Sequence, residues 1–108
     1  MTVWTAERRR SVRVPAAYPA TVHDGRGRIL TRGRTANISE HGVLLITPRR
    51  DGLLVDQQVA VELTVPAAPA ARPRRQATRT VRYHCRIART QPLGQLLGLG
   101  IEFLRKLA

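Results

Sequence analysis

Two stretches of this chain alternate between large apolar residues and small or polar ones, and this alternation constrains the fold more than any other feature. They cover residues 58–65 and 78–88, and their apolar positions are Val59, Val61, Leu63 and Val65 in the first and Val81, Tyr83, Cys85 and Ile87 in the second. A period of two places these side chains on one face of an extended strand, whereas a helix requires a period of about 3.6. The alternation therefore predicts two β-strands, each with one buried face.

Four further short strands are predicted between turn-like segments, and no long helical period occurs. The expected strands cover residues 18–23, 28–36, 43–47 and 96–103, and the expected turns cover 24–27, 37–42 and 91–94. Six short strands with tight connections predict an all-β fold. We expect a six-stranded antiparallel β-barrel rather than a sandwich, because a closed barrel leaves no strand edge exposed.

A chain of 108 residues is long enough for one domain with a single modest core. We expect a basic, mobile N-terminal segment over residues 1–15, the barrel over 16–103, and a short tail over 104–108 in which a helix could begin. The proline-rich stretch 66–73 is predicted to be a surface loop, because proline has no N–H to donate to a sheet.

The charge of the chain is strongly positive. There are 19 Lys and Arg residues against 7 Asp and Glu, a net charge of +12, and Lys106 is the only lysine. This excess favours an anionic ligand and disfavours a calcium site. The only cysteine, Cys85, cannot form an internal disulfide, and no secretory signal or membrane-spanning apolar stretch is present. We therefore expect a cytoplasmic protein without a membrane span.

The residues that could support catalysis are not arranged as in an enzyme. The three histidines, His23, His41 and His84, are not at metal-ligand spacing, and the acidic residues are scattered singly. His84 and Cys85 are neighbours on a predicted strand and therefore face opposite sides of it. We predict no catalytic residue and no metal site.

Two short polar motifs stand out from the rest of the chain. The first, Arg9-Arg10-Ser11-Val12-Arg13, places two arginines four residues apart ahead of the first strand, but such pairs recur elsewhere in this arginine-rich chain. The second, Asn37-x-Ser39-x-x-Gly42, lies in a predicted turn. It is the more informative motif, because asparagine and serine are scarce in this sequence.

In this order and at this separation, the two motifs together resemble those of the PilZ domain family. The stretch Leu99-Gly100-Ile101-Glu102-Phe103 is similar to a late strand of that family, so the resemblance extends over most of the chain. It implies a six-stranded antiparallel barrel, usually followed by a C-terminal helix. It also implies a non-enzymatic receptor that binds cyclic di-GMP and needs no other cofactor.

The resemblance implies that Arg9 and Arg13 clamp the guanine edges and phosphates of this ligand. A planar guanidinium matches the paired O6 and N7 acceptors of guanine and the oxygens of a phosphate, which a lysine would match less well. An arginine at the place of Arg8 accompanies the binding of two stacked ligand molecules in such domains. The N-terminal segment is expected to close over the ligand and to present a new surface to a partner protein.

The second motif is expected to complete the ligand site. Asn37 and Ser39 carry short polar side chains that can bond a guanine edge or a phosphate from a turn. Gly42 is expected to permit a backbone conformation, or a close approach, that a Cβ would block. The family commonly has Asp in place of Asn37, and an amide accepts guanine N–H bonds without a full negative charge, so a lower affinity is expected.

Two other functions fit the sequence. A basic β-barrel could bind RNA or DNA, but an aromatic fraction of 4% leaves few side chains to stack on bases, so nucleic acid is the less favoured partner. A PilZ-like adaptor that binds only proteins is the third hypothesis, although such members usually lack one of the two motifs. Both the cyclic di-GMP receptor and the adaptor without ligand would act on a downstream partner protein, which the sequence does not identify.

Overall fold

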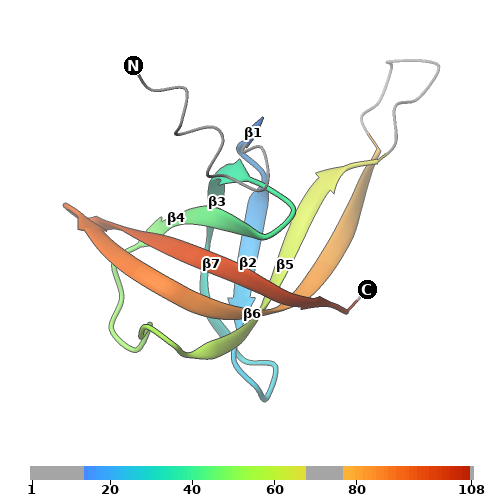
Figure 1. Cartoon of the computed structure of the whole chain (residues 1–108). Coiled ribbons are helices and arrows are strands. Elements are labelled where there is room, and N and C mark those ends of the chain that lie inside the picture. The colour runs from blue at the N-terminus through green and yellow to red at the C-terminus, as the bar shows by residue number, and fades with distance from the viewer. Residues whose placement is uncertain (1–13, 68–76, 108) are drawn as a thin grey trace, which may run out of the picture.

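The computed structural model describes residues 14–67 and 77–107, and these residues form seven β-strands (Figure 1). Between these limits the chain forms no helix, and so none that could cross a membrane. The strands are β1 (Val14–Pro15), β2 (Pro19–His23), β3 (Ile29–Ile38), β4 (Gly42–Pro48), β5 (Gln58–Pro66), β6 (Thr78–Leu93) and β7 (Leu96–Lys106).

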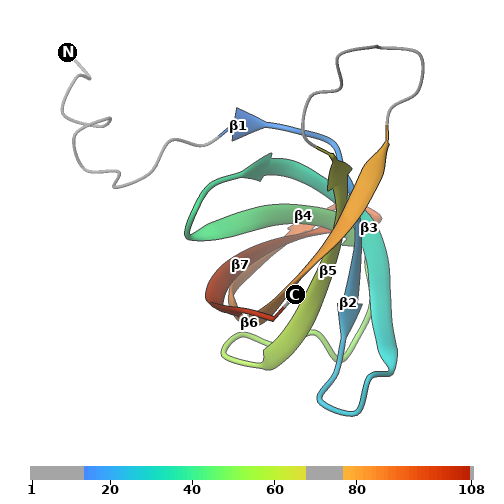
Figure 2. The same ribbon diagram turned by 90° about the vertical axis from the view of Figure 1, so that its right-hand side faces the viewer.

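The sheet closes on itself and forms a barrel. Its strand order is β1-β3-β2-β5-β6-β7-β4, every neighbouring pair is antiparallel, and an additional pairing of β3 with β4 completes the ring (Figures 1 and 2). Six strands therefore make up the barrel wall, as predicted. The seventh, β1, has two residues and pairs only with β3, outside the ring.

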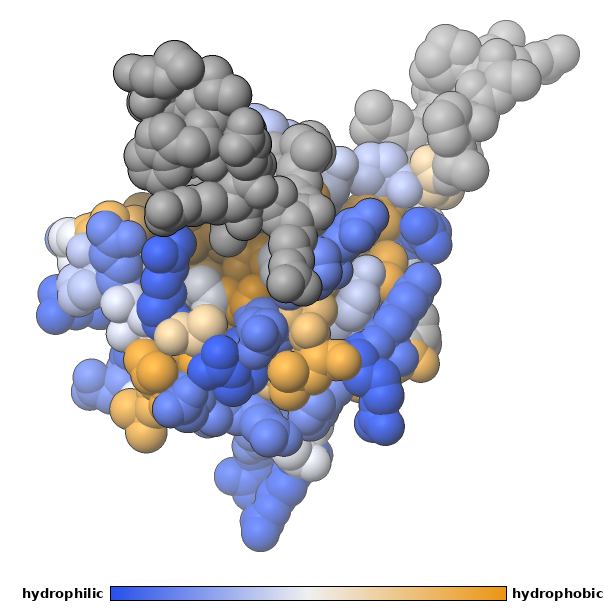
Figure 3. All heavy atoms as spheres, viewed as in Figure 1, coloured by the Kyte–Doolittle hydropathy of each residue, from blue (hydrophilic) through white to orange (hydrophobic). Residues whose placement is uncertain are grey.

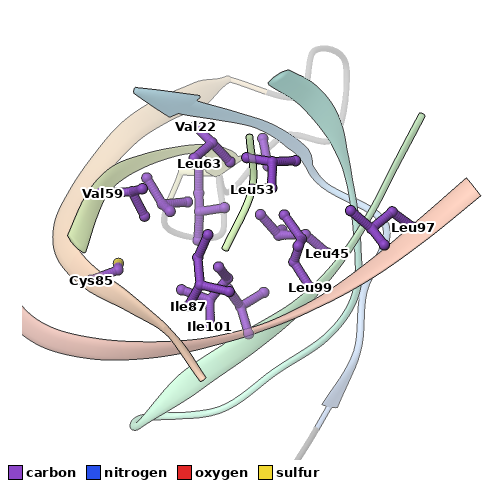
Figure 4. Packing of buried hydrophobic residues seen from close by; sticks show 13 residues of the cluster. Val22, Leu45, Leu53, Val59, Leu63, Cys85, Ile87, Leu97, Leu99 and Ile101 are labelled. Carbon is purple, nitrogen blue, oxygen red and sulfur yellow. The ribbon is translucent and has the colours of Figure 1, made fainter. Parts of the chain in front are cut away.

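The interior of the barrel is filled by aliphatic side chains from every wall strand. The positions predicted to face inward in β5 and β6 do so: Val59, Val61, Leu63, Val81, Cys85 and Ile87 are buried, while Val65 and Tyr83 are half-buried. Leu45 and Leu99 approach them from β4 and β7, and Leu53 enters from the β4–β5 loop (Figure 4). The two-residue period of the sequence therefore predicted the inner face correctly.

The prediction that residues 104–108 could begin a helix is wrong. β7 continues three residues past Phe103, and Lys106 pairs with Tyr83 of β6. Beyond it, the Leu107 amide donates to the Arg82 carbonyl over 2.8 Å. Forming the first turn of a helix is unfavourable, and a five-residue helix is too short to offset that cost with further hydrogen bonds. As a strand, the same residues form backbone hydrogen bonds with β6.

The turn predicted over residues 91–94 is shorter and lies later in the chain. β6 extends through Pro92 to Leu93, which pairs with Leu96, so that only Gly94 and Gln95 form the connection. Gly94 has a φ of 67°, the left-handed conformation that a two-residue hairpin requires. Proline is tolerated at position 92 because it lies at the end of the hairpin, where the ladder finishes.

Candidate functional site

The turn between β3 and β4 carries the Asn37-x-Ser39-x-x-Gly42 motif and is held by its own polar groups. The Ser39 amide donates to the Gly42 carbonyl over 2.9 Å, and the Ser39 hydroxyl donates to the same carbonyl over 3.3 Å. The hydroxyl also accepts a bond from the His41 amide over 3.3 Å. The Ser39 side chain therefore stabilises the turn in the absence of any ligand.

Gly42 fixes this turn against β7. It is buried and pairs with Glu102, and a Cβ at Gly42 would clash with the carbonyl oxygen of Ile101. The Phe103 amide donates to the His41 carbonyl over 2.8 Å. The structure thus brings the turn motif and the Leu99–Phe103 stretch into direct contact, although they are about sixty residues apart. The close approach that was expected at Gly42 is therefore between the backbones of β4 and β7.

The chain reaches the barrel beside the same turn. In the β1–β3 ladder, Val14 lies opposite Ile38 and Pro15 opposite Asn37. Thr35 secures the segment that follows: its hydroxyl donates to the Ala16 carbonyl and accepts a bond of 2.8 Å from the Tyr18 amide. The backbone that leads into the barrel is therefore held along β3 at the start of the turn motif.

The three arginines predicted to bind ligand, Arg8, Arg9 and Arg13, lie outside the described residues. In the sequence, Arg13 directly precedes Val14, the first residue of β1. Among the described members of the predicted site, Asn37 and Ser39 are half-buried and Gly42 is buried, and all three lie within one turn and its flanking strand ends.

The chain matches the PilZ domain family over residues 7–107, which is nearly its full length. It belongs to this family. A search of solved structures finds a similar fold in the inhibitor of motility (MotI/DgrA) of Bacillus subtilis, with a TM-score of 0.69 and 19% sequence identity. The similar region covers 94% of this chain and 44% of that one, so this chain spans less than half the length of its structural neighbour. No curated protein sequence matches the chain significantly.

An ion-pair network on the outer surface of this PilZ domain joins β6, β7 and the loop between β4 and β5. The Arg86 guanidinium lies 2.9 Å from the Glu102 carboxylate and 2.5 Å from that of Asp56. These two carboxylates, Glu102 first, raise the pKa of Arg86. Glu102 is the register partner of Gly42, so the network supports the strand on which the turn rests. Sequence analysis placed Arg86 on the outer face but had no signal for Asp56, which lies 30 residues away.

Two of the remaining arginines are engaged within the barrel wall. The face shown in Figure 3 carries hydrophilic and apolar residues side by side. Arg82 pairs with Glu62 over 2.7 Å across the β5–β6 ladder, and Arg34 donates to the Ala17 carbonyl over 3.2 Å. Part of the arginine excess therefore stabilises the barrel wall, so the net charge overstates the number of guanidinium groups available to a ligand.

Neither metal chemistry nor thiol chemistry has a place in the described part of this domain. There, no group of three or more His, Cys, Asp or Glu side chains could hold a metal ion. Burial in the barrel raises the pKa of the Cys85 thiol to about 12, an effect that a backbone hydrogen bond with Val61 partly opposes. At neutral pH Cys85 is therefore a protonated core residue that fills space.

Proposed function

We propose that this PilZ domain is a receptor for cyclic di-GMP that passes the signal to a partner protein by contact. Membership of the family supports the ligand class. The single observation that carries the proposal is the β1–β3 register, in which Val14 and Pro15 lie opposite Ile38 and Asn37. Because Arg13, the last residue of the arginine motif, is one peptide bond from Val14, this register supports a position of Arg13 near the turn motif.

The chemistry of the turn favours a guanine edge over a phosphate as the group that Ser39 meets. The hydroxyl already uses its one proton in the bond to the Gly42 carbonyl and one lone pair in the bond from the His41 amide. One lone pair remains, which can accept an N–H of guanine but can donate nothing to a phosphate. The phosphates then fall to Arg9 and Arg13, whose guanidinium groups only donate.

This division of roles also suggests how a signal arises. A doubly anionic ligand held at the turn would draw the arginine motif toward it, and the segment ahead of Val14 would take a new arrangement. We do not expect the barrel itself to change conformation on binding, since its closed sheet and packed core resist deformation. We therefore assign the output surface to the N-terminal segment with its bound ligand, and the recipient to a separate protein.

Isothermal titration calorimetry with cyclic di-GMP tests the proposal. Arg9→Gln and Arg13→Gln should each weaken binding at least about tenfold, because each removes charge-assisted hydrogen bonds. Arg32→Gln is the matched control: it removes the same charge from an exposed position on β3 and should leave the affinity within about twofold. Cyclic di-AMP and GTP serve as competitors, and a single-stranded oligonucleotide tests the nucleic-acid hypothesis.

Two results would contradict the receptor function. One is the absence of cyclic di-GMP binding by the wild-type chain at about 100 μM protein. The other is equal binding by the wild type and by the Arg9 and Arg13 variants. If the oligonucleotide binds instead, with a steep loss of affinity as salt is added, the basic barrel is a nucleic-acid-binding protein.

A further inference from the structure

One end of the barrel is left open by unequal strand lengths. β5 and β6 pair as far as Pro66 and Thr78, but the β2–β5 ladder ends at Leu63 and the β6–β7 ladder ends at Tyr83. β5 and β6 consequently extend past their neighbours as a two-stranded ribbon (Figures 1 and 2). Among the described residues, no strand pairs with either edge of this ribbon.

A hollow of about 310 Å³ lies against the inner face of this ribbon. Polar and apolar surface contribute about equally to its lining, and its apolar and aromatic side chains come from three strands and the chain that precedes β2: Tyr18, Ile38, Leu63, Val65, Val81 and Tyr83. The Tyr83 ring is stacked on Phe103 with a centroid separation of 4.0 Å and an interplanar angle of 11°, which fixes one wall in place. A hollow of this volume is at the small end of the range for ligand pockets.

Two cations lie at this hollow. Arg79 and Lys106 contribute to its lining, both are exposed, and neither forms an ion pair with any residue that the structure describes. By contrast, Arg82 and Arg86, further along β6, are both paired with carboxylates. A hollow with an apolar wall and two cations that have no ion-pair partner is complementary to an anion with an apolar body.

We propose that this hollow is a second ligand site, separate from the turn motif, for a small anion with an aliphatic or aromatic body. The body lies against Val65, Val81 and Tyr83, and the anionic head lies between Arg79 and Lys106. The site is separate because Ile38 and Asn37 are neighbours on β3, and neighbours on a strand face opposite sides. Ile38 lies opposite the buried Val43 and packs against the core, whereas Asn37 lies on the other face of β3.

Fluorescence titration of the whole chain with 8-anilinonaphthalene-1-sulfonate, an aromatic anion, tests this site, with octanoate as an aliphatic competitor. We expect saturable binding of one probe per chain, displacement by octanoate, and no displacement by octylammonium, which has the same body and the opposite charge. The double variant Arg79→Gln/Lys106→Gln should weaken both anions about tenfold. The matched double variant Arg32→Gln/Arg50→Gln removes equal charge from exposed positions elsewhere and should change binding less than about twofold.

Val65→Trp tests the cavity itself, because a large side chain on the half-buried wall position should fill the hollow and abolish probe binding. The thermal midpoint of each variant, measured beside the titration, identifies any that has lost its fold. Binding of neither anion at about 1 mM, or equal weakening by both charge variants, would overturn the proposal. So would displacement of the probe in proportion to cyclic di-GMP bound. A chain that binds the probe but no cyclic di-GMP would support this site and contradict only the receptor function.

Discussion

The β2–β3 turn and the β3–β4 turn both connect neighbouring strands of the barrel, but they are stabilised in different ways. The first is local: the Asp24 carboxylate accepts the Arg26 and Arg28 amides over 2.8 and 2.9 Å, and Gly27 adopts a φ of 83°. Nothing lies within 4 Å of a Cβ built on Gly27. In the second turn Gly42 has no positive φ, but a Cβ there would clash with the backbone of β7. One glycine is required by conformation and the other by space.

This difference shows why the second turn can carry a binding motif. A turn held only by its own residues can move as a unit with little effect on the barrel. The β3–β4 turn is joined to β7 through Gly42 and His41, and Glu102 of β7 is held by Arg86. Polar groups in that turn are thus positioned by the barrel before any ligand arrives, which lowers the entropic cost of binding.

The largest expected effect is that of Gly42→Ala. The added methyl would force β4 and β7 apart, at a cost of about 3 kcal/mol in the free energy of unfolding and roughly 10 °C in thermal midpoint. Gly27→Ala should cost about 1 kcal/mol, because its penalty is only that of a left-handed conformation. Chemical denaturation of both variants measures the difference. Equal costs would show that the two turns are stabilised alike.

Ser39→Ala should have a smaller effect on the ligand-free domain. It removes two side-chain hydrogen bonds, each 3.3 Å long, and should lower the free energy of unfolding by about 0.5–1 kcal/mol. Glu40→Ala, at the exposed neighbouring position of the same turn, is the control and should lie within about 0.5 kcal/mol of the wild type. A Ser39→Ala domain as stable as the wild type would leave the hydroxyl with no role in the turn.

The smallest expected effect is a pH dependence confined to the β2–β3 turn. The backbone amide of Arg28, then that of Arg26, lowers the pKa of the Asp24 carboxyl. A lowered folded-state pKa means that the carboxylate stabilises the fold above its unfolded pKa of about 3.9, and that this contribution is lost as pH falls through the folded value. Asp24→Asn should therefore destabilise the domain at pH 7 and converge with the wild type as the pH falls through the folded-state pKa of Asp24.

Urea denaturation of the two proteins from pH 7 into the acidic range follows this convergence. A constant difference across that range would mean that the Asp24 charge has no part in stabilising the turn. Ser39→Ala provides the comparison, since a hydroxyl does not titrate and its effect should not change with pH.

The sequence predicted which residues of β5 and β6 point into the barrel, because successive side chains of a strand alternate between its two faces. It also located the Asn37, Ser39 and Gly42 cluster, since a motif is a local pattern. It failed at Leu104–Lys106, where strand pairing with distant residues replaces the predicted helix start, and at Pro92, which extends the hairpin. Neither outcome can be obtained from local propensity, because each depends on which strand lies alongside.

The alternation of apolar residues was sufficient by itself to determine that this chain forms strands, which side of each faces the core, and where most turns fall. Two short motifs were sufficient to indicate its family. Only the tertiary structure decided the pairing of β4 with β7, the contact of Gly42 with Ile101, the Asp56–Arg86–Glu102 network and the open end beside Val65. The physical reason is that each of these depends on the register between segments distant in sequence, and a period of two residues carries no information about register.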